Sequence, residues 1–322
     1  MRRDTEIELV GMAFGGEEGV AKARQLAPDV IVTDVDMPAY DGVAVVRAIM
    51  QEMPTPIILL SALEKEHPKI FEALSAGAFD FLSKDDVTTT RRHPQPLLNR
   101  LIKTANQVSL KKIDAWRINK NTCLHSFDEH LQYEIIALGA STGGPAAIEA
   151  LLNALPANLS IPVVIAQHMP AYFLLAFAQR LDKISPLRVK VAECGEVLRG
   201  QTVYIMPGHT NTHIVREKAT RQPVFEFTRR QYSAFNDPSI DGLFISLAEV
   251  YGARAIGVVL TGMGKDGTEG LQAIQQRQGY TIGQDESSSV VFGMPKHAID
   301  CGVVQQVLPL REIPGFLVSC LS

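Results

Sequence analysis

Short apolar runs alternate with segments of helical spacing along residues 1–86. The runs predict β-strands at residues 7–13, 30–35, 56–62 and 79–83. Apolar positions at helical intervals predict α-helices near residues 17–26, 42–53 and 70–76. Because polar residues do not occupy every second position of the runs, they fit parallel strands covered on both faces. The order of these elements predicts an α/β fold.

A second alternation of the same kind begins at residue 134. It predicts strands near residues 135–139, 163–167, 189–192, 256–260, 280–283 and 303–307. Three further segments alternate apolar and polar positions and are separated by turn sequences, at residues 202–205, 212–216 and 224–228. We expect these three to form an antiparallel meander inserted at the edge of a doubly wound parallel sheet.

Residues 87–132 interrupt the alternation between the two halves. A loop and a polar, irregular stretch flank four apolar residues at the spacing of one helix face. These residues are Leu97, Leu98, Leu101 and Ile102. The pattern predicts a first domain at residues 1–86, a linker at 87–132 and a second domain at 133–322.

Charge is unevenly distributed along the chain, whose net charge is −4. Residues 1–86 carry 8 Lys or Arg against 16 Asp or Glu, whereas residues 87–132 carry 8 against 3. A basic stretch can indicate nucleic-acid binding. Here the basic residues are interleaved with Leu, Ile and Val, which favours a solvated linker helix. We therefore expect no nucleic-acid partner.

Length and composition narrow the class of protein. A chain of 322 residues, 46% of them hydrophobic, is long enough for two domains with separate cores. No apolar run reaches the about 18 residues of a membrane span, and the first residues lack the apolar stretch of a secretory signal. The four cysteines are scattered without a CxxC pair, which favours reduced thiols in a cytoplasmic protein.

Ser141 lies in the sequence GASTGGP, directly after an apolar strand and before a helix. In open α/β sheets the carboxyl ends of the strands face the ligand crevice, so Ser141 is expected at that edge. Glycines permit a tight turn, and the amides of the helix N-terminus follow it. The sequence matches the G-x-S-x-G pattern of a serine nucleophile at a strand-to-helix turn.

A glycine-rich turn after a strand can also bind a dinucleotide, but two features oppose that interpretation. The glycine spacing differs from G-x-G-x-x-G, and the second strand ends in His168 where an acidic residue is required. The lysine of a Walker sequence is also missing from this turn.

His168 and Asp266 follow two other predicted strands, in the sequences AQHMP and LTGMGKDG. A serine hydroxyl needs a base within hydrogen-bond reach, and an imidazole at a neighbouring strand end can serve as that base. Asp266 alone could be a helix cap. Together with a serine and a histidine, it is better explained as the carboxylate that orients the histidine. The order Ser–His–Asp differs from that of the α/β-hydrolases.

These three motifs, with YIMPGHTNTHI and VVFGMPKHA, resemble the catalytic domain of the chemotaxis protein-glutamate methylesterases, the CheB family. The resemblance covers the second domain. It implies that Ser141 is the nucleophile, His168 the general base and Asp266 its orienting carboxylate. It also implies that the backbone N–H groups of Met263 and Thr142 bind the oxyanion.

The reaction implied by this resemblance is hydrolysis of glutamyl methyl esters on the cytoplasmic helices of chemoreceptors, with release of methanol. Some members also deamidate glutamines at the same sites. No cofactor is expected for the esterase. Two alternatives stay open from the residues alone: a serine esterase of another substrate class, and a non-catalytic signalling adaptor.

The first domain resembles a response-regulator receiver, which has a flavodoxin-like fold. The sequence TDVDMP followed by DG matches the phosphoacceptor region, which implies that Asp34 is the phosphorylation site. Ser61 matches the switch hydroxyl, and Lys84 matches the lysine that contacts the phosphoryl group. The phosphodonor would be a chemotaxis histidine kinase. Phosphorylation would then regulate the esterase.

By this resemblance, the receiver is expected to be N-terminally incomplete. Receivers begin with a strand carrying an acidic pair that holds Mg²⁺, whereas this sequence opens at the equivalent of the second strand, residues 7–13. In the order 2-1-3-4-5 the absent strand is an interior one, and its neighbours would lose their shared pairing partner. Asp34 and a backbone carbonyl would be the remaining Mg²⁺ ligands. We expect either a truncated chain or start site, or a receiver not competent for phosphorylation.

Overall fold

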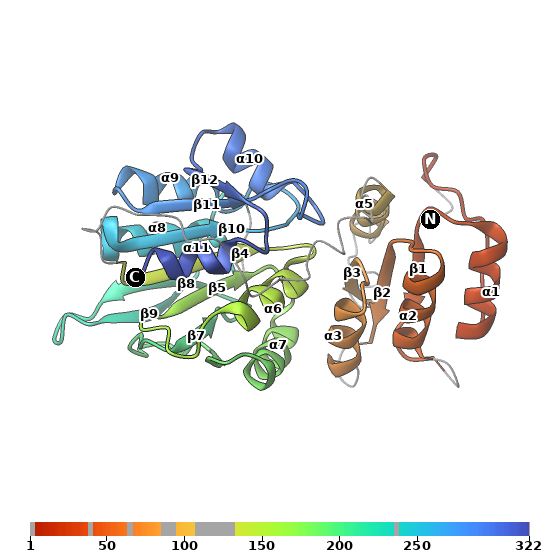
Figure 1. Cartoon of the computed structure of the whole chain (residues 1–322), viewed down its shortest axis with the longest axis horizontal. Coiled ribbons are helices and arrows are strands. Elements are labelled where there is room, and N and C mark those ends of the chain that lie inside the picture. Colours follow the sequence, from red (N-terminus) through yellow and green to blue (C-terminus); the bar gives the residue numbers. More distant parts are fainter. Residues whose placement is uncertain are drawn as a thin grey trace. The chain divides into compact units, whose positions relative to one another are not determined.

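The computed structural model describes residues 4–37, 41–62, 67–84, 95–106, 133–234 and 238–321. The chain divides into two compact units, Met1–Ile113 and Asp114–Ser322 (Figure 1). The division falls within residues 87–132, the stretch that the sequence assigns to a linker. Most of that stretch lies outside the described residues.

The first unit contains a parallel three-stranded sheet in the order β1-β2-β3. Its strands are β1 (Ile31–Asp34), β2 (Ile57–Ser61) and β3 (Asp80–Ser83). Its helices are α1 (Gly16–Leu26), α2 (Gly42–Glu52), α3 (His67–Ser75) and α5 (Gln95–Asn106). The unbroken apolar run of β2 is fully buried at its first three residues, as expected for a central parallel strand. Three of the four strands predicted here, and all three helices, are therefore confirmed.

The fourth predicted strand, at residues 7–13, is wrong. This segment forms no strand, and Leu9, Val10 and Met12 are each 45% exposed or more. Within the described residues, β1 pairs with β2 alone. A strand is held in a sheet by hydrogen bonds to a neighbour. No described strand lies at the other edge of β1. Residues 7–13 therefore form no ladder with a neighbouring strand, and apolar composition alone does not make them a strand.

Helix α5 carries the apolar face predicted within residues 87–132. Leu98, Leu101 and Ala105 are buried, and the helix contacts β2 of the first unit. The spacing of these residues therefore produces an amphipathic helix that covers the receiver-like sheet. The side chain of Leu97 lies outside the described residues.

The second unit is built on a seven-stranded sheet in the order β12-β11-β10-β4-β5-β7-β6, in which every pair is parallel. Its strands are β4 (Ile135–Ala140), β5 (Val163–Gln167), β6 (Arg188–Val191), β7 (Thr202–Ile205), β10 (Ala255–Val259), β11 (Tyr280–Gln284) and β12 (Gln306–Leu308). All six residues of the central strand β4 are buried. The predicted strand at residues 303–307 begins later in the structure, as β12.

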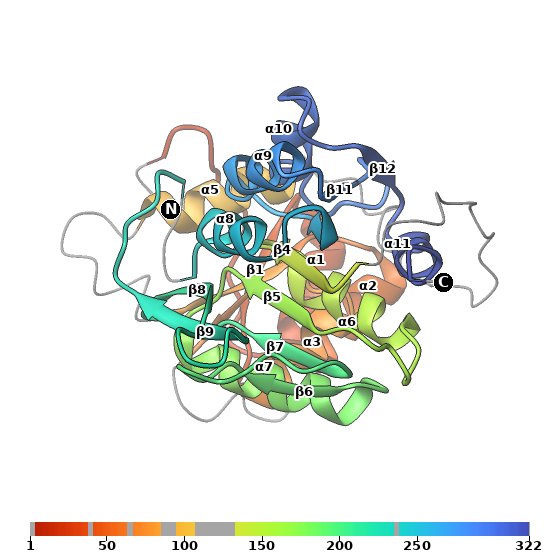
Figure 2. The same cartoon turned by 90° about the vertical axis from the view of Figure 1, so that its left-hand side faces the viewer.

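Helices pack on this sheet in two groups, as in a doubly wound fold. One group contains α6 (Gly144–Ala154), α7 (Ala171–Ile184) and α11 (Ile313–Ser319). The other contains α8 (Ile240–Tyr251), α9 (Thr268–Gln276) and α10 (Met294–Asp300), with the short 3₁₀ helix η3 (Gly252–Arg254) after α8. Figure 2 shows α8 and α9 side by side. Buried side chains of α8 form a core with residues of β4 and β10.

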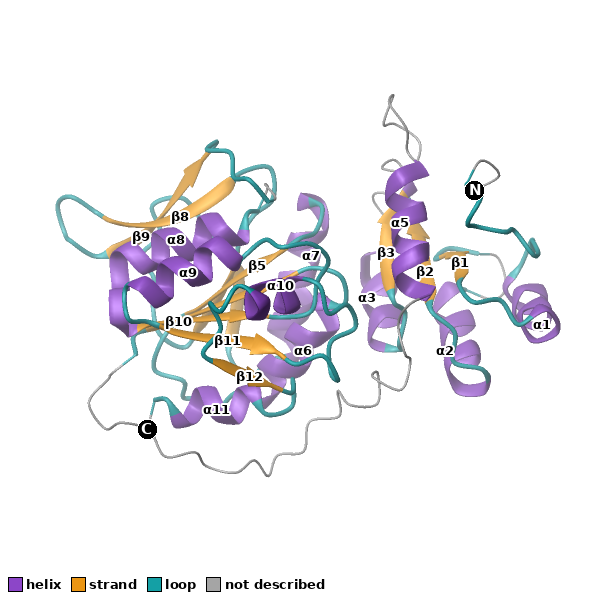
Figure 3. Ribbon diagram, turned by 90° about the horizontal axis from the view of Figure 1, so that it is seen from above, coloured by secondary structure: helices purple, strands orange, loops and turns teal. Residues whose placement is uncertain are grey.

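An antiparallel hairpin of β8 (Asn211–Arg216) and β9 (Pro223–Thr228) packs against α8 (Figure 3). The predicted antiparallel insertion is thus present, but it contains two strands and not three. The segment at residues 202–205 is β7, which lies between β5 and β6 in the parallel sheet. All four residues of β7 are buried. Its alternation of apolar and polar residues therefore does not mean that one side of the strand faces solvent.

None of the helices in the described ranges has both the length and the hydropathy that a bilayer crossing requires. Cys194, Cys301 and Cys320 are free thiols, and Cys123 lies outside the described residues.

The packing of β4 gives a prediction for stability. Ile136 is fully buried, and its truncation to alanine leaves a cavity in the centre of the sheet. We expect Ile136→Ala to lower the free energy of unfolding by about 2–5 kcal/mol in urea denaturation. Leu175→Ala on α7 is a matched control because Leu175 is 57% exposed, and its effect should stay within about 0.5 kcal/mol. Equal losses in both variants would contradict this description of the core.

Candidate active site

Ser141 is the first residue after β4, at the turn that leads into α6. Its backbone N–H donates to the Thr261 carbonyl (3.1 Å), and its own carbonyl accepts from Gly144 N–H (2.7 Å). Gly143 has a φ of 76°, a left-handed conformation that suits glycine. The glycines of the motif therefore produce the tight turn that presents Ser141 at the carboxyl edge of the sheet.

His168 follows β5, the strand next to β4. Its backbone N–H donates to the carbonyl of Ala140 (3.0 Å), the residue before Ser141. Gln167 is buried, and its Nε2 donates to the carbonyls of both Ser141 and His168, at 3.0 Å each. One amide side chain thus joins the backbone of the proposed nucleophile to that of the proposed base.

Asp266 lies between β10 and α9, with its side chain 2% exposed. Its Oδ2 is 2.7 Å from His168 Nε2 and accepts from Ile240 N–H (2.8 Å). Its Oδ1 accepts from the N–H groups of Asp241 (3.0 Å) and Gly267 (3.1 Å). The carboxylate therefore lies at the N-terminus of α8, where free N–H groups and the helix dipole stabilise negative charge.

These contacts keep Asp266 ionised although it is buried. Burial by itself raises the pKa of a carboxyl group. For Asp266 the hydrogen bond and charge attraction from His168, together with the N–H groups of Asp241 and Ile240, outweigh burial, and its pKa lies below the ordinary value. A charged Asp266 is the form that can orient an imidazole and stabilise its protonated state.

The structure brings the predicted histidine and aspartate into direct contact, and it brings the serine turn beside them. Among the hydrogen bonds between described residues, none joins Ser141 Oγ to the His168 ring. Because Nε2 of His168 bonds to Asp266, Nδ1 is the ring nitrogen that would accept a proton from the serine hydroxyl. Hydrogen bonds of catalytic groups are often long without substrate and tighten when it binds.

Thr142, one predicted oxyanion donor, follows Ser141 directly, and the residue before Met263, the other, lies close to Ser141. The backbone N–H groups of Thr142 and Met263 donate to no acceptor among the described residues. Gly262, which precedes Met263, lies so close to Ser141 that a Cβ at this position would be 2.8 Å from Ser141 Cβ. Glycine at position 262 therefore lets the Met263 backbone approach the serine, where an oxyanion would form.

The three receiver residues lie at the carboxyl ends of adjacent strands. Asp34 ends β1, Ser61 ends β2, and Lys84 follows β3 directly. The Lys84 ammonium forms a hydrogen-bonded ion pair with Asp34 Oδ2. Ser61 is buried, and its hydroxyl donates to the carbonyl of Ala62 (3.1 Å). The structure thus joins two of the three residues and sets the third on the strand between them.

The surroundings of Asp34 do not fit the Mg²⁺ site that a receiver implies. Its Oδ1 accepts from Asp36 N–H (3.3 Å), and the Asp36 carboxylate pairs with Lys69 (3.6 Å). Mg²⁺ requires near-octahedral oxygen ligands, including one or two carboxylates. Within the described parts of the chain, no three His, Cys, Asp or Glu side chains group so as to hold a metal ion.

Three residues of the site were not identified from the sequence: Gln167, Ser239 and Asp241. Ser239 caps α8 by accepting from Gly242 N–H (3.1 Å), and its hydroxyl also reaches Asp266 Oδ1 (3.4 Å). A serine before an apolar helix is a recognisable cap signal. The contacts of Gln167 and Asp241 join segments far apart in the sequence, which no local pattern reveals.

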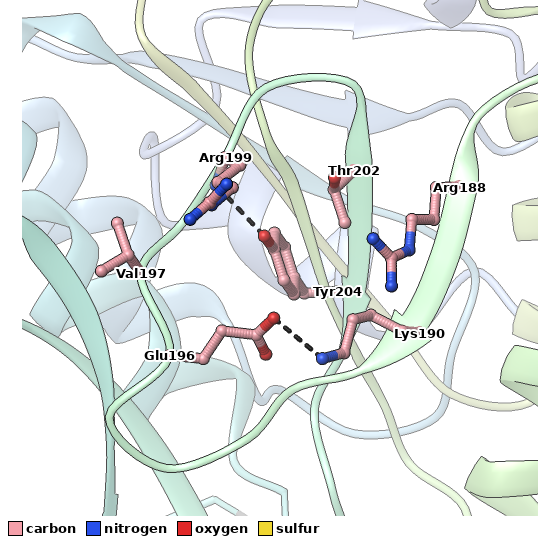
Figure 4. A pocket seen from close by; sticks show the side chains of 7 residues that line it. All are labelled: Arg188, Lys190, Glu196, Val197, Arg199, Thr202 and Tyr204. Atoms are coloured by element: carbon pink, nitrogen blue, oxygen red, sulfur yellow. Dashed lines mark hydrogen bonds and ion pairs between the residues drawn. The ribbon is translucent and has the colours of Figure 1, made fainter.

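A separate pocket of about 280 Å³ lies beside β6 and β7 (Figure 4). It is lined by Arg188, Lys190, Glu196, Val197, Arg199, Thr202 and Tyr204. Arg188 and Thr202 are the first residues of their strands, whereas Ser141 and His168 follow the last residues of theirs. The pocket therefore does not belong to the candidate active site.

Comparisons with known proteins cover both units. A family model described as CheB methylesterase matches residues 136–317, and one described as a response regulator receiver domain matches residues 2–90. A protein-glutamate methylesterase/protein-glutamine glutaminase of Desulfitobacterium hafniense is 35% identical over 369 residues, which span 100% of this chain and 93% of that protein. A protein of the same name from Pyrococcus abyssi is 36% identical, over 99% of this chain and 88% of its own length.

Among solved structures, the chain is similar to the CheB methylesterase catalytic domain of Thermotoga maritima. The two are 37% identical with a TM-score of 0.54, over 57% of this chain and 97% of that structure. The α/β fold class predicted from the sequence, with its antiparallel insertion, is confirmed.

The contacts of Gln167 give a prediction for the reactivity of Ser141. Leucine at position 167 would fill a similar volume without donating to either carbonyl. We expect Gln167→Leu to slow covalent labelling of Ser141 by a fluorophosphonate about 100-fold, because small misplacements of reacting groups cost about that much. Gln275→Leu on α9 also removes an amide-to-carbonyl bond, to Gly302, and serves as the control. Unchanged labelling in Gln167→Leu would show that the bridge does not position the serine.

Proposed function

The chain belongs to the CheB methylesterase family, and from this membership we propose that it hydrolyses methyl esters of glutamate side chains on the cytoplasmic helices of chemoreceptors. The observation that carries the proposal is the hydrogen bond between His168 and Asp266 beside the Ser141 turn. A family resemblance without a base–carboxylate pair would support common ancestry only. The enzyme would act in the cytoplasm, where its substrate helices are.

In the first step, Ser141 Oγ attacks the ester carbonyl while His168 accepts the hydroxyl proton. Nδ1 would be the accepting nitrogen, because an ionised Asp266 can only accept a hydrogen bond and therefore favours the tautomer with the hydrogen on Nε2. The ionised Asp266 stabilises the imidazolium that forms and keeps its proton on Nε2. The carbonyl oxygen becomes an oxyanion that accepts from the backbone N–H groups of Thr142 and Met263.

The tetrahedral intermediate then collapses to an acyl-enzyme. The C–O bond to the methoxy group breaks, and the imidazolium of His168 returns its proton to the leaving oxygen, so methanol departs. Water attacks the acyl-enzyme with His168 again as base, which releases glutamate and restores Ser141. With a glutamine side chain the same steps expel ammonia, so deamidation requires no additional group.

The central test is methanol release from methylated chemoreceptor. We expect Ser141→Ala to lower turnover about 10⁶-fold, as removal of a serine nucleophile does elsewhere. Ser185→Ala is a control because Ser185 lies outside the candidate site, after α7, and donates no proton to any substrate group in this mechanism.

Two outcomes would favour the alternatives. Turnover of a simple chromogenic ester, with none of the methylated receptor, would indicate a serine esterase of another substrate class. Failure of the wild-type chain to turn over either substrate would indicate a non-catalytic adaptor.

For the first unit, the receiver resemblance supports Asp34 as the phosphoacceptor position, with Lys84 as its contact and a histidine kinase as donor. The ion pair between Asp34 and Lys84 supports this assignment. Regulation of the esterase by that phosphorylation requires a metal site that the described residues around Asp34 do not fit.

We therefore expect negligible stable phosphate uptake when this chain is incubated with acetyl phosphate and Mg²⁺. The physical reason is that the charge developing on the phosphoryl group lacks the cation that neutralises it. Asp34→Asn provides the background measurement, because its amide cannot form an acyl phosphate. Uptake by the wild-type chain that Asp34→Asn abolishes would refute the expectation and restore a phosphorylation-competent receiver.

A further inference from the structure

One buried acid beside the triad has no role in the steps above. Asp241 is the second residue of α8 and is 1% exposed. Its backbone N–H donates to Asp266 Oδ1 (3.0 Å), so its carboxyl group lies next to the carboxylate that orients His168. A buried carboxyl group without a positive partner is costly in its charged form, and its presence here calls for a physical explanation.

The two oxygens of Asp241 have different surroundings. Oδ1 accepts from Gly270 N–H (2.8 Å), whereas Oδ2 is buried and has no hydrogen-bond donor among the described residues. An ionised Asp241 would leave Oδ2 unsatisfied. A protonated Asp241 could instead donate from Oδ2, and the acceptor beside it is the carboxylate of Asp266.

The charges around Asp241 also favour the neutral acid. Burial raises its pKa most, followed by the negative charge of Asp266; Glu269 on α9 raises it further, and Gly270 N–H opposes the shift. The pKa of Asp241 reaches about 8. Both oxygens of Asp266 have hydrogen-bond donors, whereas Oδ2 of Asp241 has none among the described residues, so a proton shared by the two groups belongs on Asp241.

Resting on the proposed function, we propose that Asp241 is a positioning residue, a neutral acid whose Oδ2 proton donates to Asp266 and fixes that carboxylate against His168. The proton stays on Asp241 throughout turnover. At alkaline pH Asp241 loses this proton, and two negative charges then lie side by side in a buried site. Their repulsion would disturb the contact between Asp266 and His168, so activity should fall as Asp241 ionises.

Two variants separate this role from a purely structural one. In Asp241→Asn the amide oxygen can accept from Gly270, and the amide NH₂ can donate to Asp266 at any pH. Asp241→Leu has a similar volume but neither donates nor accepts. We expect kcat/KM to fall about 100-fold in Asp241→Leu with little change in KM, and less than about tenfold in Asp241→Asn. If Asp241 only fills space, Asp241→Asn should have no higher kcat/KM than Asp241→Leu, which has a similar volume.

The pH profile gives the second readout. Between about pH 6 and about pH 10, the wild-type chain should lose activity in a step that Asp241→Asn lacks. The same step should appear in the rate at which a fluorophosphonate labels Ser141, which requires no receptor substrate. If the receptor is not hydrolysed but the labelling step is present, the proposed function fails and the role of Asp241 stands.

Folding stability gives a readout independent of catalysis. The pKa of Asp241 is higher in the folded than in the unfolded chain. The protonated Asp241 therefore adds to the free energy of unfolding at any pH below its pKa in the unfolded chain, and this addition is lost as pH rises toward about 8. The stability of the wild-type chain relative to Asp241→Asn should therefore decrease over that range. The proposal is overturned if the two chains have the same pH dependence of labelling and stability, or if Asp241→Asn is as impaired as Asp241→Leu.

Discussion

The buried negative charge of Asp266 is the constraint on which the arrangement of the catalytic unit depends. A carboxylate with 2% of its side chain exposed has lost nearly all its hydration, so other groups must replace the water. The replacements are N–H groups at the start of α8, the Gly267 N–H and the His168 ring. Helix α8 must begin at this point, and β5 must end opposite it. The start of α8 and the end of β5 thus provide groups that contact Asp266.

The order of strands explains how three residues distant in sequence reach one edge. β4 lies between β5 and β10, and all three run in the same direction. Ser141, His168 and Asp266 follow these strands, so a parallel sheet with this order brings them to the same side. Chain order among the three has no influence on their geometry. The sequence Ser–His–Asp can therefore produce the chemistry found with other orders in other folds.

Local sequence patterns predicted where the candidate residues lie in the fold, whereas their catalytic roles stay predictions. An apolar run followed by a glycine-rich turn identified the position of Ser141 in the fold, and strand ends identified His168 and Asp266. Gln167 and Asp241 were missed because their effects come from tertiary contacts. The segment at residues 7–13 was predicted incorrectly because its composition suits a strand, whereas a strand also needs a neighbour. The same limit explains why residues 202–205 were assigned to the antiparallel insertion. They form β7 of the parallel sheet because they pair with β5 and β6, and the composition of the segment does not reveal those partners.

The two units stabilise their central carboxylates in different ways, and the difference follows from their chemistry. Asp34 is partly exposed and forms an ion pair with Lys84, so a full positive charge compensates its carboxylate. A lysine beside Asp266 would cancel the negative charge that, in the proposed mechanism, stabilises the imidazolium of His168. Neutral N–H donors, and a neutral Asp241, satisfy the oxygens of Asp266 without cancelling that charge. In the proposed mechanism, its negative charge therefore remains able to stabilise the imidazole when that ring is protonated.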